Sequence, residues 1–94
     1  MDIQFLNEIM LYFGKRNQVL KAIEELSELQ KELCKALLTP KTLCEVPTET
    51  IIDELADVEI MCEQLRHIFD ISKQVDERKI FKIERLEQRL NETT

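Results

Sequence analysis

The chain contains few of the residues that interrupt regular secondary structure. Its 94 residues include one glycine, Gly14, and two prolines, Pro40 and Pro47. A fold built from many strands needs frequent turns, and turns are rich in glycine and proline, so this composition argues against such a fold. The sequence therefore predicts long helices joined by few connections.

Cysteine is scarce as well. The three cysteines, Cys34, Cys44 and Cys62, are odd in number and show no CxxC spacing. This pattern argues against a disulfide framework and against a zinc site. We expect reduced, mostly buried thiols in a cytoplasmic protein.

Long apolar runs and an excess of positive charge are also missing. No run approaches the roughly 20 apolar residues that a transmembrane helix needs. The amphipathic stretch over residues 3–13 carries Glu8 and lacks the basic start of a signal peptide. The net charge of −6 disfavours a nucleic-acid duplex as partner, because duplex binding needs clustered Lys and Arg. A single nucleotide is compatible with this charge, since a bound cation inverts the local electrostatics.

Helical periodicity is the main structural signal that is present. Apolar residues recur at helical spacing over residues 2–13, 16–38, 49–69 and 73–90. Gly14 suits a helix C-cap, Thr48 or Thr50 can cap the third helix, and residues 39–47, which hold both prolines, are expected to form a loop. We therefore predict one all-α domain over residues 1–94. It is four-helix bundle-like, with a central antiparallel hairpin of the second and third helices, and is completed by oligomerisation.

The same periodicity predicts which helix faces are buried. In the first helix the apolar residues are Phe5, Leu6, Ile9, Met10 and Phe13. In the second they are Val19, Ile23, Leu26, Leu33 and Leu37. In the third they are Ile51, Leu55, Val58, Met61, Cys62, Leu65 and Phe69. In the fourth they are Val75, Ile80, Ile83, Leu86 and Leu90. The first and fourth helices need a surface to cover, so we expect at least a dimer.

Two acidic clusters carry the functional signal. Glu24, Glu25 and Glu28 lie in the second helix, and Glu54 and Asp57 lie in the third. At about 100° per residue, Glu24 and Glu28 fall opposite the apolar stripe of their helix and Glu25 falls toward its edge. A solvated, charged face would show the same pattern, so the first cluster alone is a weak signal.

The second cluster is more telling, because Glu54 falls inside the apolar stripe of its helix. A buried carboxylate costs several kcal/mol unless it is paired or coordinated. Two explanations stay open: Glu54 binds a hard divalent cation through oxygen, or it pairs with a Lys or Arg of a neighbouring helix. The first cluster ends about 16 Å before the loop and Glu54 lies about 10 Å after it. About one helical turn of slack would bring the clusters to the same height.

These acidic patterns resemble a known family, the all-α nucleoside triphosphate pyrophosphohydrolases, which include MazG, dimeric dUTPases and phosphoribosyl-ATP pyrophosphatase. The family carries EExxE on one helix and ExxD on the next. Here the first pattern lies in the segment EELSELQKEL and the second in IIDELADVEIMCEQL. The segment KIERLEQRL is similar to the basic last helix of small MazG-like proteins, and the resemblance covers residues 18–90.

The resemblance implies hydrolysis of a nucleoside triphosphate to the monophosphate and pyrophosphate, with attack of water at the α-phosphorus. It implies Mg²⁺ as cofactor, held by Glu25, Glu28, Glu54 and Asp57. It further implies that the catalytic residues are Glu24, Glu25 and Glu54, with Glu24 either a ligand or a carboxylate behind the ligands. Members of the family assemble as homodimers or homotetramers.

Basic residues are expected to meet the remaining phosphate charge. The candidates on the last helix are Lys82, Arg85 and Arg89, and Lys21 is a weaker candidate. The alternative is that the last-helix residues are solvated and pair with Glu84 and Glu87.

Some features depart from the family pattern. The chain has no Trp and no recognisable cluster of aromatics that would contact a base. Phe5, Tyr12 and Phe13 could stack on a base, but we expect them to pack in the core, and we expect His67 to be a surface residue. Two further hypotheses stay open: a helical interaction module without enzymatic activity, and a degenerate family member that binds nucleotides without hydrolysing them.

Overall fold

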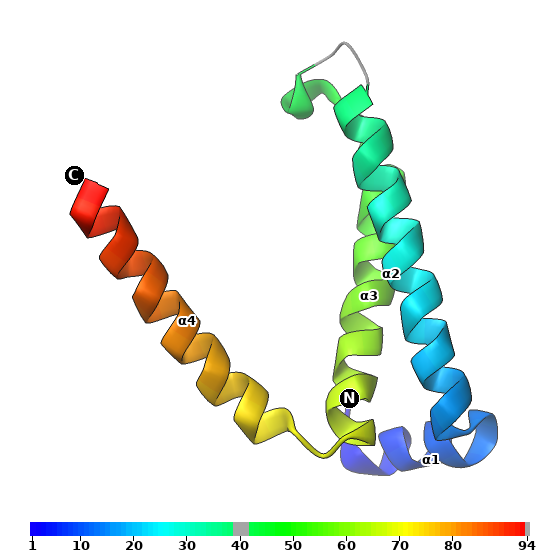
Figure 1. Cartoon of the computed structure of the whole chain (residues 1–94). Coiled ribbons are helices and arrows are strands. Elements are labelled where there is room, and N and C mark those ends of the chain that lie inside the picture. Colours follow the sequence, from blue (N-terminus) through cyan, green and yellow to red (C-terminus); the bar gives the residue numbers. More distant parts are fainter. Residues whose placement is uncertain (39–41, 94) are drawn as a thin grey trace.

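The computed structural model, which describes residues 1–38 and 42–93, confirms the all-α prediction. Its α-helices are α1 (Ile3–Phe13), α2 (Lys15–Leu38), α3 (Glu49–Ile68) and α4 (Ser72–Thr93) (Figure 1). A short 3₁₀ helix, η1 (Leu43–Glu45), lies within the predicted loop, and no described residue belongs to a strand. The helices begin and end within one residue of their predicted limits, except that α4 runs to Thr93. Residues 39–41 of the predicted loop lie outside the described residues.

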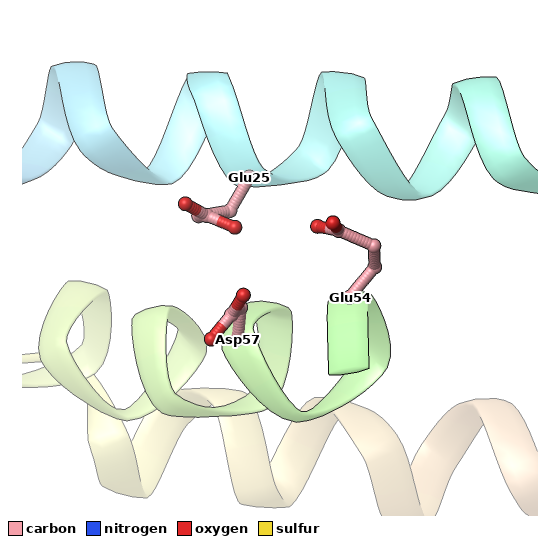
Figure 2. Close-up of side chains that lie close together, drawn as sticks. All are labelled: Glu25, Glu54 and Asp57. Carbon is pink, nitrogen blue, oxygen red and sulfur yellow. The ribbon is translucent and has the colours of Figure 1, made fainter. Parts of the chain in front are cut away.

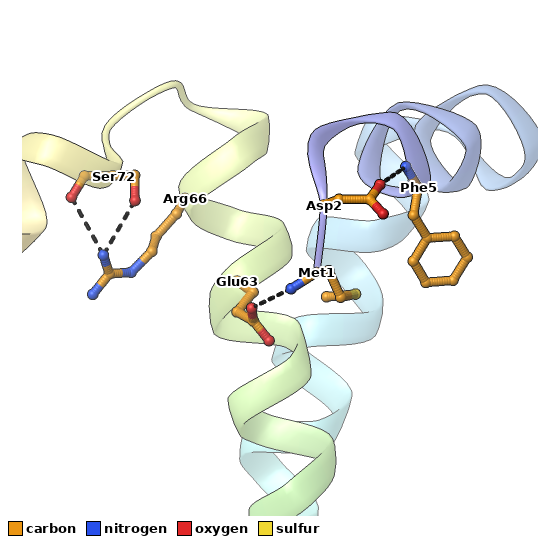
Figure 3. A network of polar contacts seen from close by, with 6 residues as sticks. All are labelled: Met1, Asp2, Phe5, Glu63, Arg66 and Ser72. Atoms are coloured by element: carbon orange, nitrogen blue, oxygen red, sulfur yellow. Dashed lines mark hydrogen bonds and ion pairs between the residues drawn. The ribbon is translucent and has the colours of Figure 1, made fainter.

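Local hydrogen bonds explain where α1 begins and ends. The Phe5 N–H donates to Asp2 Oδ1 at 2.8 Å, which caps the helix N-terminus (Figure 3). Gly14 follows the last turn with φ 90° and ψ 142°, and its N–H donates to the Met10 carbonyl. Few L-residues adopt this backbone conformation, so glycine is required where α1 turns into α2.

A tight corner joins α3 to α4. Asp70 has a left-handed φ of 53°. Its N–H donates to the His67 carbonyl at 3.2 Å, and the Ile71 N–H donates to the Arg66 carbonyl at 3.0 Å. These two bonds form a Schellman motif, with aspartate in the position that usually holds glycine. Arg66 also donates to Ser72 (Figure 3). The same side chain pairs with Asp76 at 2.7 Å, so the corner has side-chain bonds as well.

The predicted antiparallel hairpin of α2 and α3 is confirmed, and the two helices lie side by side over most of their length (Figure 1). Its interface holds small and polar side chains together with a few larger apolar ones. The buried residues are Gln18, Ala22, Glu25 and Ala36 of α2, and Val58, Met61 and Gln64 of α3. Gln18 Nε2 donates to Gln64 Oε1 at 2.7 Å within this interface. A buried amide pair is satisfied in one helix register only, so it specifies how α2 aligns with α3.

The predicted buried face of α2 is wrong for this chain. Four of its five apolar residues are exposed, namely Ile23, Leu26, Leu33 and Leu37. The face that packs on α3 lies about a quarter turn around the helix from this stripe. The small side chains of Ala22 and Ala36 let the two backbones approach closely there, which the bulkier stripe could not do.

Other burial predictions fail for a related reason. Phe5, Tyr12 and Phe13 are all at least half exposed, so the expectation of core packing is wrong. Cys34, Cys44 and Cys62 are exposed rather than buried. A chain with one main helix–helix interface has room in that interface for few side chains, and in α1 they are Leu6 and Met10.

The fourth helix diverges from the hairpin after its first turns (Figure 1). None of its described residues is buried. The radius of gyration is 17.0 Å, whereas a compact domain of this length has about 12 Å. The described chain is therefore a hairpin with a projecting arm, and α4 does not complete a bundle within it. No helix, over the described residues, combines the length and apolar character needed to cross a membrane.

Replacing Gly14 with Ala tests the backbone at the α1–α2 junction. The nearest atom to an added Cβ is Asn17 Nδ2 at 3.8 Å, so there is room for the methyl group and the penalty comes from the positive φ. We expect Gly14→Ala to lower the free energy of unfolding by about 1–3 kcal/mol, measured by urea denaturation. Asp70→Gly serves as the reciprocal control and should preserve or raise stability. Unchanged unfolding of Gly14→Ala would contradict the assigned conformation.

Candidate metal centre

The two acidic segments meet across the hairpin, as expected. Glu25 projects from α2 toward Glu54 and Asp57, which project from α3 (Figure 2). One carboxylate oxygen from each residue lies within 4.8 Å of the others. Antiparallel packing produces this meeting, because it places the middle of α2 opposite the first half of α3.

The three carboxylates are largely withdrawn from solvent. The Glu25 side chain is 11% exposed, and Glu54 and Asp57 are half-buried. Glu54 Oε2 is buried, and no described residue donates a hydrogen bond to it. A buried, unpartnered carboxylate oxygen is unfavourable by several kcal/mol in general. This atom marks the point at which the site lacks a positive partner.

The raised pKa values of Glu54 and Asp57 also indicate that the group lacks a positive charge. Burial raises the pKa of Glu54, and the negative charges of Glu25 and Asp57 raise it further. Burial also raises the pKa of Asp57, followed by the charge of Glu25. Both shifts mean that the folded chain disfavours three ionised carboxylates at this place, and a bound cation would reverse the preference.

Lys21 supplies the nearest positive charge. Its Nζ lies 3.1 Å from Glu25 Oε1 and 3.9 Å from Glu24 Oε1. The hydrogen bond to Glu25 and the charge of Glu24 raise the Lys21 pKa. Lys21 is half exposed and pairs at the edge of the group, so it leaves Glu54 Oε2 without a donor. The alternative in which a Lys or Arg satisfies Glu54 is therefore not realised among the described residues.

The residues present fit a hard divalent cation. All the converging donors are carboxylate oxygens, which Mg²⁺ and Ca²⁺ prefer, and neither His nor Cys belongs to the group. Three protein oxygens are too few to complete the shell of either ion. Such a set suits Mg²⁺, which keeps several waters and shares its remaining positions with substrate phosphates.

Two predicted residues of α2 lie outside the group of three. Glu28 is exposed, yet its charge contributes to the raised pKa of Glu54, so it lies close to the group. Glu24 is exposed and forms an ion pair with Lys21 at 3.9 Å. Of the three glutamates in the first motif, Glu25 belongs to the carboxylate group, whereas Glu28 and Glu24 lie at its edge or outside it.

The predicted phosphate-binding residues of α4 are not brought to the carboxylates within one chain. Lys82, Arg85 and Arg89 are exposed, and they belong to the part of α4 that lies apart from the hairpin (Figure 1). Lys21, the weaker candidate, is the basic residue that the fold places beside the site.

Asp53 contributes to the electrostatics of the site and was not predicted to do so. Asp53 is exposed, but its charge helps to raise the pKa of both Glu54 and Asp57. Its position directly before Glu54 was the available signal. His67 was predicted to be a surface residue rather than a ligand. It is half-buried, and its Nε2 lies 2.8 Å from Asn7 Oδ1 of α1 in an exposed contact. It takes no part in the carboxylate group.

Comparisons with known proteins add no relative. The chain matches no protein-family model, no curated protein and no solved structure. A function for the chain is therefore argued from the carboxylate group and its surroundings.

The raised pKa values predict how stability changes with pH when metal is removed. The folded state holds protons on Glu54 and Asp57 at pH values where the unfolded chain, near pKa 4.5 and 3.8, has lost them. Their contribution to stability therefore improves as pH falls from neutral through the raised folded values, and levels off below the unfolded values. In EDTA, Glu54→Gln should be more stable than wild type at pH 7, and the difference should shrink on acidification. Urea denaturation at several pH values measures this, and a difference independent of pH would refute it.

Proposed function

We propose that the chain is an Mg²⁺-dependent nucleoside triphosphate pyrophosphohydrolase that releases the monophosphate and pyrophosphate. The observation that carries this proposal is the buried Glu54 Oε2, unpartnered among the described residues and grouped with oxygens of Glu25 and Asp57. The ordered acidic motifs of α2 and α3 resemble those of this enzyme class, and the fit of the donor set to a hard cation supports the same conclusion.

In this proposal Glu25, Glu54 and Asp57 bind Mg²⁺, and Glu28 joins them from the next turn of α2. When bound, Mg²⁺ supplies positive charge for the triphosphate and lowers the pKa of a coordinated water. Glu24 lies behind these ligands, at the edge of the site, where it pairs with Lys21. Lys21 then has a second role, since its ammonium can contact a phosphate oxygen beside Glu25.

The hairpin fixes the positions of these groups. Glu25 and the two α3 carboxylates belong to different helices, and the Gln18–Gln64 bond sets the register between those helices. Glu25 lies seven positions, about two turns, after Gln18, and Asp57 lies seven before Gln64. One buried amide pair thus aligns both halves of the site.

Pyrophosphate release from a panel of NTPs and dNTPs tests the proposal. We expect release with Mg²⁺, none with EDTA, and a loss of at least about 100-fold in Glu54→Gln, because the central ligand loses its charge. Glu59→Gln is the matched control, since Glu59 is an exposed carboxylate on the same helix and stands outside the group. Full activity in a folded Glu54→Gln protein would show that the site assignment is wrong.

The rival function is a helical interaction module without catalysis. Its support is the exposed apolar surface of α2 and α4, which a binding protein would present to a partner. A degenerate member of the enzyme class is the intermediate case: it would bind Mg²⁺ and nucleotide but release no pyrophosphate.

Thermal melting separates these functions. At about ten times its dissociation constant, a cation that binds only the folded chain stabilises it by about 1.4 kcal/mol. For a domain of this size the melting temperature then rises by about 6–11 °C. We expect this rise with Mg²⁺ in wild type and in Glu59→Gln, and little or none in Glu54→Gln. Equal shifts in all three proteins would indicate binding elsewhere, and no shift in any would favour the interaction module.

A further inference from the structure

Lys21 places a positive charge at one edge of the carboxylate group. Its Nζ lies 3.1 Å from Glu25 Oε1 and 3.9 Å from Glu24 Oε1. The ammonium therefore contacts one of the three carboxylates that converge across the hairpin (Figure 2). A lysine in this position partly neutralises the acidic group from the side of α2.

The compensation by Lys21 is confined to one part of the group. The hydrogen bond with Glu25 and the charge of Glu24 raise the pKa of Lys21, with a smaller contribution from Asp57. Burial and the charge of Glu25 raise the pKa of Asp57, and the charge of Lys21 opposes that rise. No described residue donates a hydrogen bond to Glu54 Oε2. The α2 edge of the group thus has a cation of its own, whereas the Glu54 side has none among the described residues.

A divalent cation and the Lys21 ammonium would compete for Glu25. Mg²⁺ in the proposed site takes an oxygen of the same carboxylate that Lys21 contacts. Two positive charges a few ångströms apart repel each other, and more strongly in a site that is partly withdrawn from water. The metal therefore binds most favourably when Lys21 moves away. Lys21 is free to move, since its side chain is half exposed and an exposed ion pair contributes little to stability.

A phosphate group offers Lys21 a new partner. The ammonium carries three N–H donors, and charge-assisted hydrogen bonds to phosphate oxygens are strong. A triphosphate that shares the coordination of Mg²⁺ brings such oxygens next to Glu25. The basic residues of α4 lie apart from the hairpin within one chain, so Lys21 is the basic residue placed to receive them (Figure 1).

We propose that Lys21 couples the two ligands of the site: it opposes the binding of Mg²⁺ alone, and it transfers from Glu25 to a phosphate oxygen when a triphosphate binds with the metal. This inference rests on the proposed function and goes beyond a phosphate contact. A contact alone would strengthen phosphate binding and leave the metal unaffected. Transfer of the ammonium makes each ligand promote the other, by the same factor in both directions.

Lys21→Met tests this coupling, because it removes the charge and keeps most of the length of the side chain. NMR titration with Mg²⁺ alone should give a dissociation constant at least about fivefold lower than that of wild type. At saturating free Mg²⁺, the dissociation constant of inorganic tripolyphosphate should be at least about fivefold higher. The two changes have opposite signs, whereas damage to the fold would weaken the binding of both ligands.

Lys31→Met is the matched control. Lys31 is an exposed lysine of the same helix, ten residues after Lys21, which places it about 15 Å farther along the axis. Its removal changes the net charge equally, but at this distance salt screens its effect on the site. Both dissociation constants should therefore stay close to those of wild type. Lys21→Arg keeps the positive charge and should keep the weak binding of Mg²⁺ alone.

The titrations distinguish failure of this inference from failure of the proposed function. If wild type binds Mg²⁺ and Lys21→Met binds it equally or more weakly, the coupling is overturned and the metal site stands. Unchanged affinity of Lys21→Met for tripolyphosphate would overturn the transfer to phosphate. Equal tightening of Mg²⁺ binding in Lys31→Met would show that overall charge, rather than Lys21, opposes the metal. If neither wild type nor Lys21→Met binds Mg²⁺ at millimolar concentrations, the proposed function fails as well.

Discussion

The contact between α2 and α3 is the constraint on which the rest of the structure depends. It supplies most of the buried side chains of the described chain, and it also holds three carboxylates close together. These two features oppose each other, because like charges withdrawn from water destabilise the interface that gathers them. Alanines that allow close approach and a satisfied Gln18–Gln64 pair stabilise the hairpin around this unfavourable centre. In proteins generally, departures of this kind from the rules of stability tend to occur at functional sites.

Periodicity was sufficient to predict the helices of the described chain. It also identified Glu54 as a carboxylate on a buried face, because a single polar residue in an apolar stripe is visible in the sequence alone. The meeting of Glu25 with Glu54 and Asp57 followed from antiparallel packing across a short loop. These predictions depend on local spacing and on one topological step, both of which a sequence of this kind records.

The faces of the helices were harder to predict. The strongest apolar stripe of α2, which includes Ile23 and Leu33, does not face α3, because the hairpin packs through alanine and glutamine instead. Periodicity shows that a face is apolar but not which surface covers it. The direction of α4 could not be predicted either. It depends on a left-handed backbone conformation at Asp70, and such a conformation is normally indicated in a sequence by glycine rather than aspartate. For the same reason the basic residues of α4 could not be placed relative to the carboxylates.

The corner between α3 and α4 has a further consequence. Backbone hydrogen bonds at Asp70 and Ile71, together with the Arg66–Asp76 pair, aim α4 by contacts among residues close in the sequence. The direction of the arm is thus set by the chain itself before anything binds to it. A preorganised arm loses little conformational entropy on association, so more of its apolar burial is expressed as affinity. The geometry of a few corner residues thereby reduces the conformational entropy that the 22-residue helix α4 would lose on association with a covering surface.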